Sequence, residues 1–184
     1  MHNLLRGVAA ILTKMGCRRT IHRPGSDGKP QLYLERFYLW KSPNREVMLH
    51  RFYMSDRGDL HNHPWDSGGV ILAGGYWEYI PAYELLWGRT EEDVAFQRAH
   101  KFWRKPWHFG NRRASDYHKV ELKPGTEGKV WTLFWTNKRV QSWGFHKVGE
   151  GFIPYREMFR RDGTDTISED NTQFKGTLFP RKSQ

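Results

Sequence analysis

The sequence has a single cysteine, Cys17, and no long hydrophobic run. One thiol excludes an intrachain disulfide, and nothing points to an oxidising compartment. No stretch approaches the ~20 apolar residues that span a bilayer. The apolar run from Gly7 to Leu12 is short, and Lys14 interrupts it before any cleavage pattern of a secretory signal. We therefore expect a cytoplasmic protein with no membrane partner.

The chain also lacks any block of like charge, although its 30 basic residues outnumber its 20 acidic ones and give a formal net charge of +10. A positive balance favours an anionic partner, such as a nucleotide, a nucleic acid or a phosphorylated metabolite. A basic and solvated surface explains the same balance. Charge alone therefore names no ligand.

The length of 184 residues fits one compact domain with a real core. Nine tryptophans and a negative mean hydropathy indicate large rigid side chains inside and a polar exterior, which excludes disorder throughout. We expect an N-terminal helix and linker over residues 1–30, a β-barrel over 31–154, and a C-terminal helix with a loose tail over 155–184.

Two segments have the pattern of helices. Apolar residues recur at helical spacing between residues 4 and 15, with Asn3 available as N-cap and Gly16 as the stop. The apolar face of this helix is expected to pack on a sheet, which is commoner than docking a partner. The segment YREMFRR, after Pro154, predicts a short terminal helix, and the polar sequence beyond it predicts a loose tail.

The middle of the chain has the pattern of an all-β domain. Short runs rich in aromatic and β-branched residues predict strands, and Gly74-Gly75 suits a tight hairpin turn between two of them. Residues 81–93 are expected to form a loop or short helix over a barrel mouth. Strands so many and so short favour a barrel or sandwich. The predicted strands are 31–40, 45–54, the two parts of 68–80, 94–104, the segment after Tyr117, and 129–136.

His61 and His63 form the most informative motif. Side chains at i and i+2 of a strand project from the same face, so the two imidazoles can close on one metal ion while Asn62 points away. The alternative is that both are ordinary half-buried histidines, as most such pairs are.

At these residues the sequence resembles the cupin superfamily, whose first motif has an HxH pair, then a carboxylate, then a glycine. Gly74 stands at the place of that glycine, and His118, in ASDYHKVEL, matches the histidine of the second cupin motif. The resemblance covers roughly residues 45–136. It implies a double-stranded β-helix, or jelly-roll barrel, in which His61, His63 and His118 hold a metal.

The sequence departs from the cupin pattern at the carboxylate. The usual Glu position falls on Ser67, with Asp66 just before it, and the opening glycine is displaced to Gly58. By strand parity Asp66 faces away from the histidines, unless a bulge or the Pro64 turn re-aims it. The site therefore has three His ligands, or three His and Asp66. We favour the first, with Asp66 orienting a ligand histidine.

The ligand set restricts the metal without naming it. Three neutral imidazoles suit divalent Fe, Zn, Ni or Cu, and an added carboxylate moves the preference toward Fe or Mn. We expect one divalent ion, with iron first and zinc, manganese and nickel as alternatives. Three or four protein ligands leave coordination positions open, which favours catalysis over a structural role.

Three residues on the predicted strands are candidate catalytic groups. His50 shares strand parity with Phe52 and can face the interior as an acid or base, although a hydrogen-bonded core histidine is the commoner case. Tyr76 and Glu78 alternate on the strand after the glycine turn and can reach a substrate. Glu78 can equally well lie outside in water.

Three further residues are candidate substrate contacts. Arg112 and Arg113 lie in the loop-like GNRRASDYH, where two guanidinium groups can hold a phosphate or carboxylate, or can simply be solvated. Trp65 can belong to an aromatic wall that stacks a flat base or sugar. The mixture of basic and aromatic residues in 100–113 also resembles a nucleic-acid surface.

Two classes of function follow. The leading hypothesis is a mononuclear metal-dependent cupin enzyme, an oxygenase or dioxygenase acting on a small polar or anionic substrate, with a lyase, isomerase or epimerase on a sugar or nucleotide as the nearest alternative. The second is a non-catalytic module that binds a nucleotide or nucleic acid. A homodimer is compatible with either hypothesis.

Overall fold

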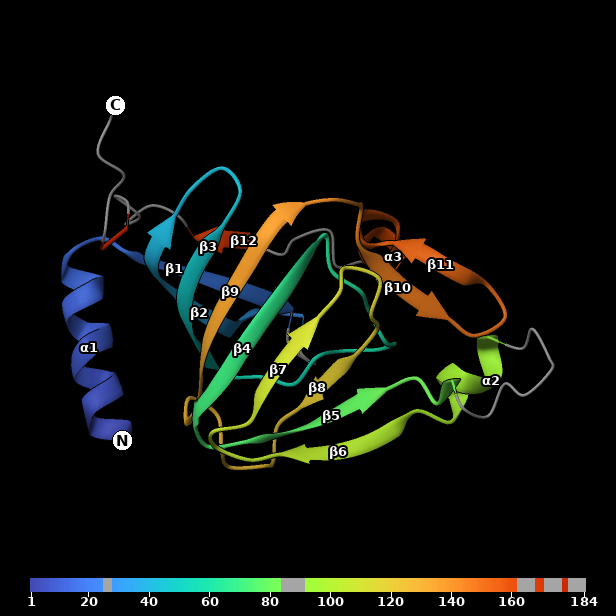
Figure 1. Ribbon diagram of the computed structural model, residues 1–184, viewed down its shortest axis with the longest axis horizontal. Coiled ribbons are helices and arrows are strands. Elements are labelled where there is room, and N and C mark those ends of the chain that lie inside the picture. The colour runs from blue at the N-terminus through green and yellow to red at the C-terminus, as the bar shows by residue number, and fades with distance from the viewer. Residues whose placement is uncertain (25–27, 84–91, 162–167, 171–176, 179–184) are drawn as a thin grey trace.

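The computed structural model describes residues 1–24, 28–83, 92–161, 168–170 and 177–178. Most of this chain is antiparallel β-sheet (Figure 1). The helices are α1 (His2–Lys14), α2 (Glu92–Gln97) and α3 (Tyr155–Arg161). The strands are β1 (Arg18–Pro24), β2 (Pro30–Lys41), β3 (Glu46–Phe52), β4 (Trp65–Ala73), β5 (Tyr76–Ile80), β6 (His100–Arg104), β7 (Phe109–Arg112), β8 (Lys119–Glu121), β9 (Val130–Arg139), β10 (Gly144–Lys147), β11 (Gly151–Pro154) and β12 (Ser168–Asp170).

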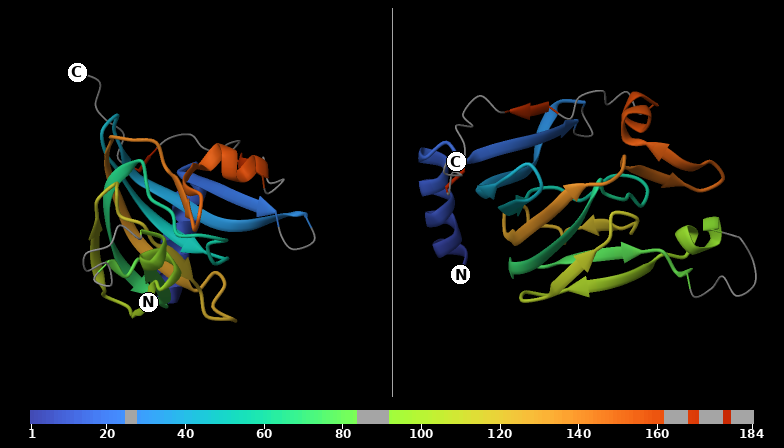
Figure 2. Two further views of the ribbon diagram at one scale, coloured as in Figure 1. Left: turned by 90° about the vertical axis from the view of Figure 1, so that its right-hand side faces the viewer. Right: turned by 45° about the horizontal axis from the view of Figure 1, so that its top comes forward.

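The strands between β3 and β9 pair as in a jelly roll. The large sheet has the order β12-β1-β2-β3-β9-β4-β7, and a second sheet has the order β6-β5-β8. An isolated bridge joins His61 to His118, next to β8. The first of these segments pairs with the last, the second with the last but one, and so on toward the middle of the chain. The pairs are β3 with β9, His61 with His118, β4 with β7, and β5 with β6. This nesting is that of a double-sheet jelly roll, and the predicted fold class is confirmed. Figure 2 shows the two sheets from other sides.

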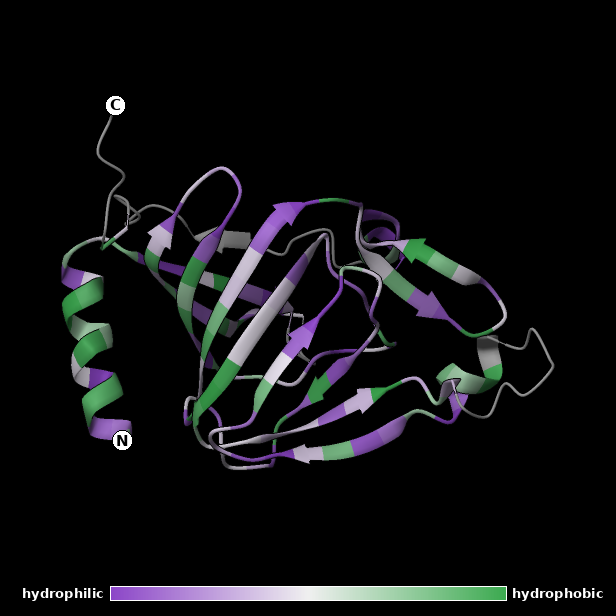
Figure 3. Ribbon diagram, in the orientation of Figure 1, coloured by the Kyte–Doolittle hydropathy of each residue, from purple (hydrophilic) through white to green (hydrophobic). Residues whose placement is uncertain are grey.

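Helix α1 covers the outer face of the large sheet. Its residues Leu5 and Leu12 belong to a buried cluster with Phe37, Leu49 and Trp131, which come from three neighbouring strands. The apolar residues recur along the helix in Figure 3. Successive side chains of a strand alternate between the two faces of the sheet. The strand residues next to Phe37, Leu49 and Trp131 therefore point to the other face, into the barrel. The main core therefore lies outside the barrel.

The Gly74-Gly75 turn does not close a hairpin, which corrects the prediction. Both glycines have positive φ, +78° and +156°, and a Cβ on Gly74 would lie 2.8 Å from the Lys129 carbonyl oxygen. The turn is thus as tight as expected. However, β4 pairs with β7 and β9, whereas β5 pairs with β6 and β8, so the turn carries the chain from one sheet to the other.

Three local predictions differ from the structure. Part of the strand expected over 94–104 is helix α2, because Ala95 and Phe96 pack into a small cluster with Leu60. Residues 18–24 are strand β1 rather than linker, since they pair with β2. Helix α1 begins at His2 with Met1 as its cap, and no side chain, Asn3 included, makes a capping bond. Helix α3 coincides with the predicted terminal helix.

In the described part of the chain, no helix is long and apolar enough to span a membrane. Most of the loop expected over the barrel mouth lies outside the described residues, since 84–91 are not described. The same holds for most of the expected tail beyond 161, so both stay predictions.

Candidate metal centre

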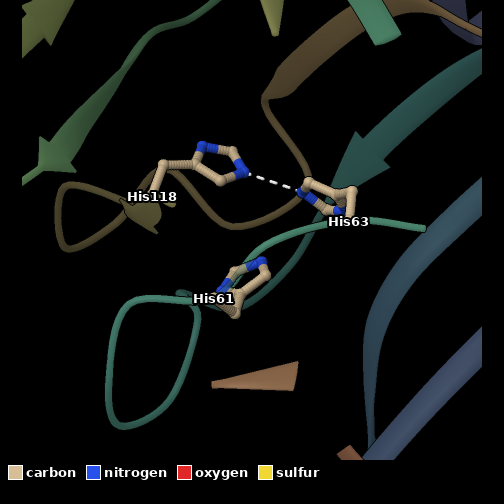
Figure 4. Close-up of side chains that lie close together, drawn as sticks. All are labelled: His61, His63 and His118. Carbon is tan, nitrogen blue, oxygen red and sulfur yellow. Dashed lines mark hydrogen bonds between the residues drawn. The ribbon is translucent and has the colours of Figure 1, made fainter. Parts of the chain in front are cut away.

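Two chain segments bring three histidines together. His61 and His63 lie on the connection from β3 to β4, and His118 immediately precedes β8. His61 and His118 exchange two backbone hydrogen bonds, each 2.9 Å long, which fix the two segments side by side. The strand expected through both residues of the HxH pair is reduced to a bridge at His61. In Figure 4 the three rings face a common space.

The three rings have a compact and nearly symmetric arrangement. Their centroids are 5.1 Å, 5.1 Å and 5.2 Å apart, and one ligand nitrogen of each ring lies within 4.8 Å of the other two. The Nε2 atoms of His63 and His118 are 2.9 Å apart. Two nitrogens that bind one ion at about 2.1 Å and at a right angle lie about 3.0 Å apart. The spacing of this pair therefore fits adjacent ligands of one metal ion.

Glu78 orients His118. Its Oε1 accepts a hydrogen bond from His118 Nδ1 at a distance of 2.8 Å. Because an ionised carboxylate can only accept, Nδ1 of His118 carries the proton of this hydrogen bond, which leaves Nε2 as the nitrogen that can bind a metal. The ring is thus held with Nε2 toward His63, to whose Nε2 it is hydrogen-bonded.

The Glu78 carboxylate is buried, with 3% of the residue exposed, and it is fully engaged. Arg104 Nε donates to its Oε2 at 2.8 Å, and Arg112 forms an ion pair with Oε1. Burial by itself would raise the pKa of Glu78, but the interaction with His118, the charge of Arg112 and the hydrogen bond from Arg104 lower it to about 2. Glu78 is therefore ionised, and its role is to position His118.

His61 and His63 are neutral. Burial lowers the pKa of His61 to about 4, although the charge of Asp56 opposes this shift, and burial lowers the pKa of His63 well below its usual value. A neutral imidazole is the form that binds a metal. In addition, His61 Nδ1 is buried with no hydrogen-bond partner among the described residues, a cost that a ligand at this cluster can remove. The donor set fits a divalent cation.

The histidines line a cavity of about 160 Å³ inside the barrel. Its walls come from both sheets and include apolar side chains of Phe52, Ile71 and Phe134. Five further residues that the sequence analysis selected also line it, namely His50, Trp65, Tyr76, Glu78 and Arg112. The histidine cluster thus faces a partly open cavity that can hold a small molecule.

His50 and Tyr76 lie in this cavity in their uncharged forms. The ring of His50 stacks on Phe134, with centroids 4.8 Å apart, and its Nε2 is buried without a partner in the described chain. Burial, and then the charge of Arg36, lower the pKa of His50 well below its usual value. Burial, and then the charge of Glu78, raise the pKa of Tyr76.

Asp66 does not take either predicted role. Its side chain is exposed on β4, and Oδ1 accepts a hydrogen bond of 2.7 Å from the backbone N–H of Ala114. The register shifts between Trp65 and Ser67, so a bulge is present, but it does not turn the carboxylate into the histidine cluster. Asp66 ties β4 to the loop that leads to His118, and Glu78 orients that histidine.

Arg112 and Arg113 do not act as a pair. Arg112 lines the cavity, but Glu78 neutralises it. Arg113 is exposed and outside the cavity lining, and its backbone N–H donates to Asp116 Oδ2. Adjacent residues of a strand end point to opposite sides, which separates them. Trp65 is a cavity residue, with its ring nearly parallel to that of His63.

Sequence reasoning missed two charged residues of the cavity, Asp56 and Arg36. Asp56 accepts hydrogen bonds from the Tyr33 hydroxyl and the Val120 backbone N–H. The turn sequence around it has no pattern that indicates a cavity residue. Arg36 alternates with Leu34 on an otherwise apolar strand face. A lone charge on the inward face of a strand was the signal that could have identified it.

No protein-family model matches the chain, and no curated protein matches it. Solved structures with a similar fold include a cupin superfamily protein from Desulfitobacterium hafniense DCB-2, 15% identical over 57% of this chain and 77% of its own, with a TM-score of 0.40. KdgF from Halomonas sp. is 15% identical over 58% and 80%, with a TM-score of 0.39. Hydroxypropylphosphonic acid epoxidase from S. wedmorenis is 12% identical over 57% and 51%, with a TM-score of 0.40. At these identities the likeness concerns the fold alone.

Proposed function

We propose that this chain is a mononuclear metal-dependent enzyme of the cupin type, an oxygenase or dioxygenase that acts on a small polar or anionic substrate. The observation that carries this proposal is the position of three imidazoles on the wall of a partly open cavity. Structural metal sites are closed by four protein ligands. Three ligands beside a cavity favour a site with positions left for a substrate.

The chain supplies the surroundings of the reaction. An ion bound by the three histidines supplies Lewis acidity and, if it is iron, redox chemistry. Glu78 fixes the orientation of the His118 ring through a hydrogen bond. The rings of Phe52 and Phe134 line the cavity and keep water out of that part of it. Tyr76, whose phenol stays protonated, can donate a proton to a substrate there.

Iron remains the metal that we propose, with zinc and nickel as alternatives. Manganese would be favoured by an added carboxylate ligand, and Asp66 does not provide one. Three imidazoles without a carboxylate suit divalent iron, zinc and nickel.

His50 favours a second candidate function, a lyase or isomerase. Its neutral imidazole lines the same cavity, and its Nε2 has no partner in the described chain. Such a group can take a proton from a substrate carbon, which lyases and isomerases need and dioxygenases do not. The two candidates differ in their requirement for dioxygen.

The non-catalytic nucleotide-binding alternative has weaker support. A cavity of about 160 Å³ is smaller than the ~300 Å³ at which sites for drug-sized molecules begin. The segment 100–113 does expose aromatic rings, those of Phe102, Trp107 and Phe109. Nucleic-acid binding there, and a homodimer, stay predictions.

Oxygen consumption tests the proposal. The full chain is loaded anaerobically with Fe²⁺ and mixed with small amino acids, hydroxy acids and phosphonates, with and without dioxygen. We expect substrate-dependent oxygen consumption that His118→Ala abolishes and that Arg113→Gln, a change at an exposed residue, leaves intact. Turnover without dioxygen would instead identify the lyase or isomerase, and activity that persists after metal removal would contradict both.

A further inference from the structure

Arg36 faces the cavity from the centre of the large sheet. It lies directly opposite His50 on β3, and His50 lies opposite Thr132 on β9. Cross-strand partners share a face, with Cβ atoms about 4.5–5.5 Å apart. The next residue, Phe37, packs on the α1 side, and all three members of the row line the cavity.

The guanidinium of Arg36 has no counterion among the described residues. Its Nε is buried without a hydrogen-bond partner, and in the described part of the chain no carboxylate forms an ion pair with it. The second arginine of the cavity differs, since Arg112 is paired with Glu78. An unpaired charge in a partly buried position is unfavourable unless a ligand compensates for it.

Neither acidic residue of the cavity wall pairs with Arg36. Glu78 is bound by two arginines and His118, and Asp56 accepts hydrogen bonds from the Tyr33 hydroxyl and the Val120 backbone N–H. Arg36 thus brings an unpaired positive charge to a cavity whose histidine cluster fits a cation.

Outside the histidine cluster, Trp65 Nε1 shares the condition of Arg36. It can only donate, and it is buried without a partner among the described residues. An unpaired guanidinium and an unpaired indole N–H in one cavity are groups that bind an oxyanion. The volume of about 160 Å³ limits that oxyanion to a small molecule.

We infer that Arg36 anchors the substrate through an oxyanion group, a carboxylate or a phosphonate, so that the substrate is a small organic acid held between Arg36 and the histidine cluster. This inference rests on the proposed function, because it names the substrate class of the same cavity. Arg36 makes direct contact with the substrate in this arrangement, whereas Arg112 acts through Glu78.

Calorimetric titration of the full chain with lactate, lactamide and methylphosphonate tests the inference. Each probe is titrated into the Zn²⁺-loaded and the metal-free chain. We expect an anion to bind both forms and the neutral lactamide to bind at least about tenfold more weakly, since charged hydrogen bonds discriminate by about this factor. The tighter of the two anions identifies the anchoring group as carboxylate or phosphonate. Failure of both anions to bind, or equal binding of lactamide, would overturn the inference.

Arg36→Gln should weaken binding of the anion about 10–100-fold in both forms without loss of Zn²⁺. Arg36→Lys, which keeps the charge, should restore part of the affinity, and Arg113→Gln should have no effect because Arg113 is exposed and outside the cavity lining. Unchanged affinity in Arg36→Gln would overturn the inference. If the wild-type chain does not bind Zn²⁺, the proposed metal centre is contradicted. The titrations of the metal-free chain would still decide the role of Arg36.

Thermal unfolding without ligand adds a readout that a structural role would not produce. Because no carboxylate in the described part of the chain pairs with Arg36, Arg36→Gln should raise the unfolding midpoint. The matched variant Arg51→Gln, which removes one of the two arginine partners of Glu35, should lower it. A drop in Arg36→Gln as large as that in Arg51→Gln would show an internal partner and overturn the inference.

Discussion

Glu78 gives the sharpest prediction about the metal centre, because it supports the centre without touching the ion. Replacement by Gln keeps an oxygen that can accept from His118 Nδ1, so the tautomer is retained. The negative charge is lost, however, and Arg104 and Arg112 are left without their counterion close to the site of a dication. The Glu78→Gln variant therefore separates the charge of Glu78 from its hydrogen bond.

The expected loss of metal affinity is about 10–100-fold for Glu78→Gln, the range found when the partner of a ligand histidine is changed. This corresponds to about 1.4–2.8 kcal/mol. Glu78→Ala should lose more, because nothing then holds the proton on Nδ1. Both variants should also unfold more easily, by roughly 2–4 kcal/mol, since the two arginines are only 21% and 22% exposed and would lose a buried partner.

Competition with a chelator measures the Zn²⁺ dissociation constant of each variant. Glu121→Gln is the matched control, because that carboxylate lies on the neighbouring strand β8, is 39% exposed and pairs with Lys101 away from the histidines. Its dissociation constant should stay within about twofold of wild type, as expected for a surface pair. Zn²⁺ affinity that is unchanged in both Glu78 variants would refute the positioning role.

Three further predictions follow from the same geometry. Asp66→Ala should keep one equivalent of metal, because its carboxylate binds only the Ala114 backbone N–H in the described chain; metal loss as severe as in a histidine variant would restore Asp66 as a ligand. Lowering the pH from 6.5 toward about 4 should destabilise the metal-free chain, since the unfolded state takes up protons on His61 and His63 that the folded state excludes. Urea titrations should show a loss of up to about 1.4 kcal/mol per pH unit for each ring, and a flat profile would contradict the neutral cluster. Trp131→Ala should cost about 3–5 kcal/mol of unfolding free energy, because the ring is fully buried under α1, and a cost under about 1 kcal/mol would show that this core is misassigned.

The features that the sequence predicted are those with local or strictly periodic signals. The HxH spacing, the helix that Gly16 ends and the helix at Tyr155–Arg161 are each contained in a few neighbouring residues. The all-β class followed from alternation along single strands. Sheet membership does not follow in this way, because whether Gly74-Gly75 closes a hairpin depends on which distant strands take the hydrogen bonds of β4 and β5.

The histidine cluster was predictable from the sequence, but its electrostatics were not. His61, His63 and His118 matched a motif, whereas the role of Glu78 depends on partners 26 and 40 residues away in sequence. Arg36 stood out even less, since what distinguishes it is the absence of an acidic partner in the described chain, and a missing contact has no sequence pattern. Arg112 and Arg113 look equivalent as sequence neighbours, and only the structure shows that Arg112 forms an ion pair with Glu78.

Metal stoichiometry tests the central claim most directly. The full chain and its His61→Ala, His63→Ala and His118→Ala variants are dialysed to equilibrium against Fe²⁺ without oxygen, or against Zn²⁺, and analysed for metal and protein. Because the three imidazoles form one site, wild type should retain one ion per chain and each variant far less than one, with folding checked by circular dichroism. A full equivalent of metal in any folded single variant, or none in the wild-type chain, would contradict the three-histidine centre.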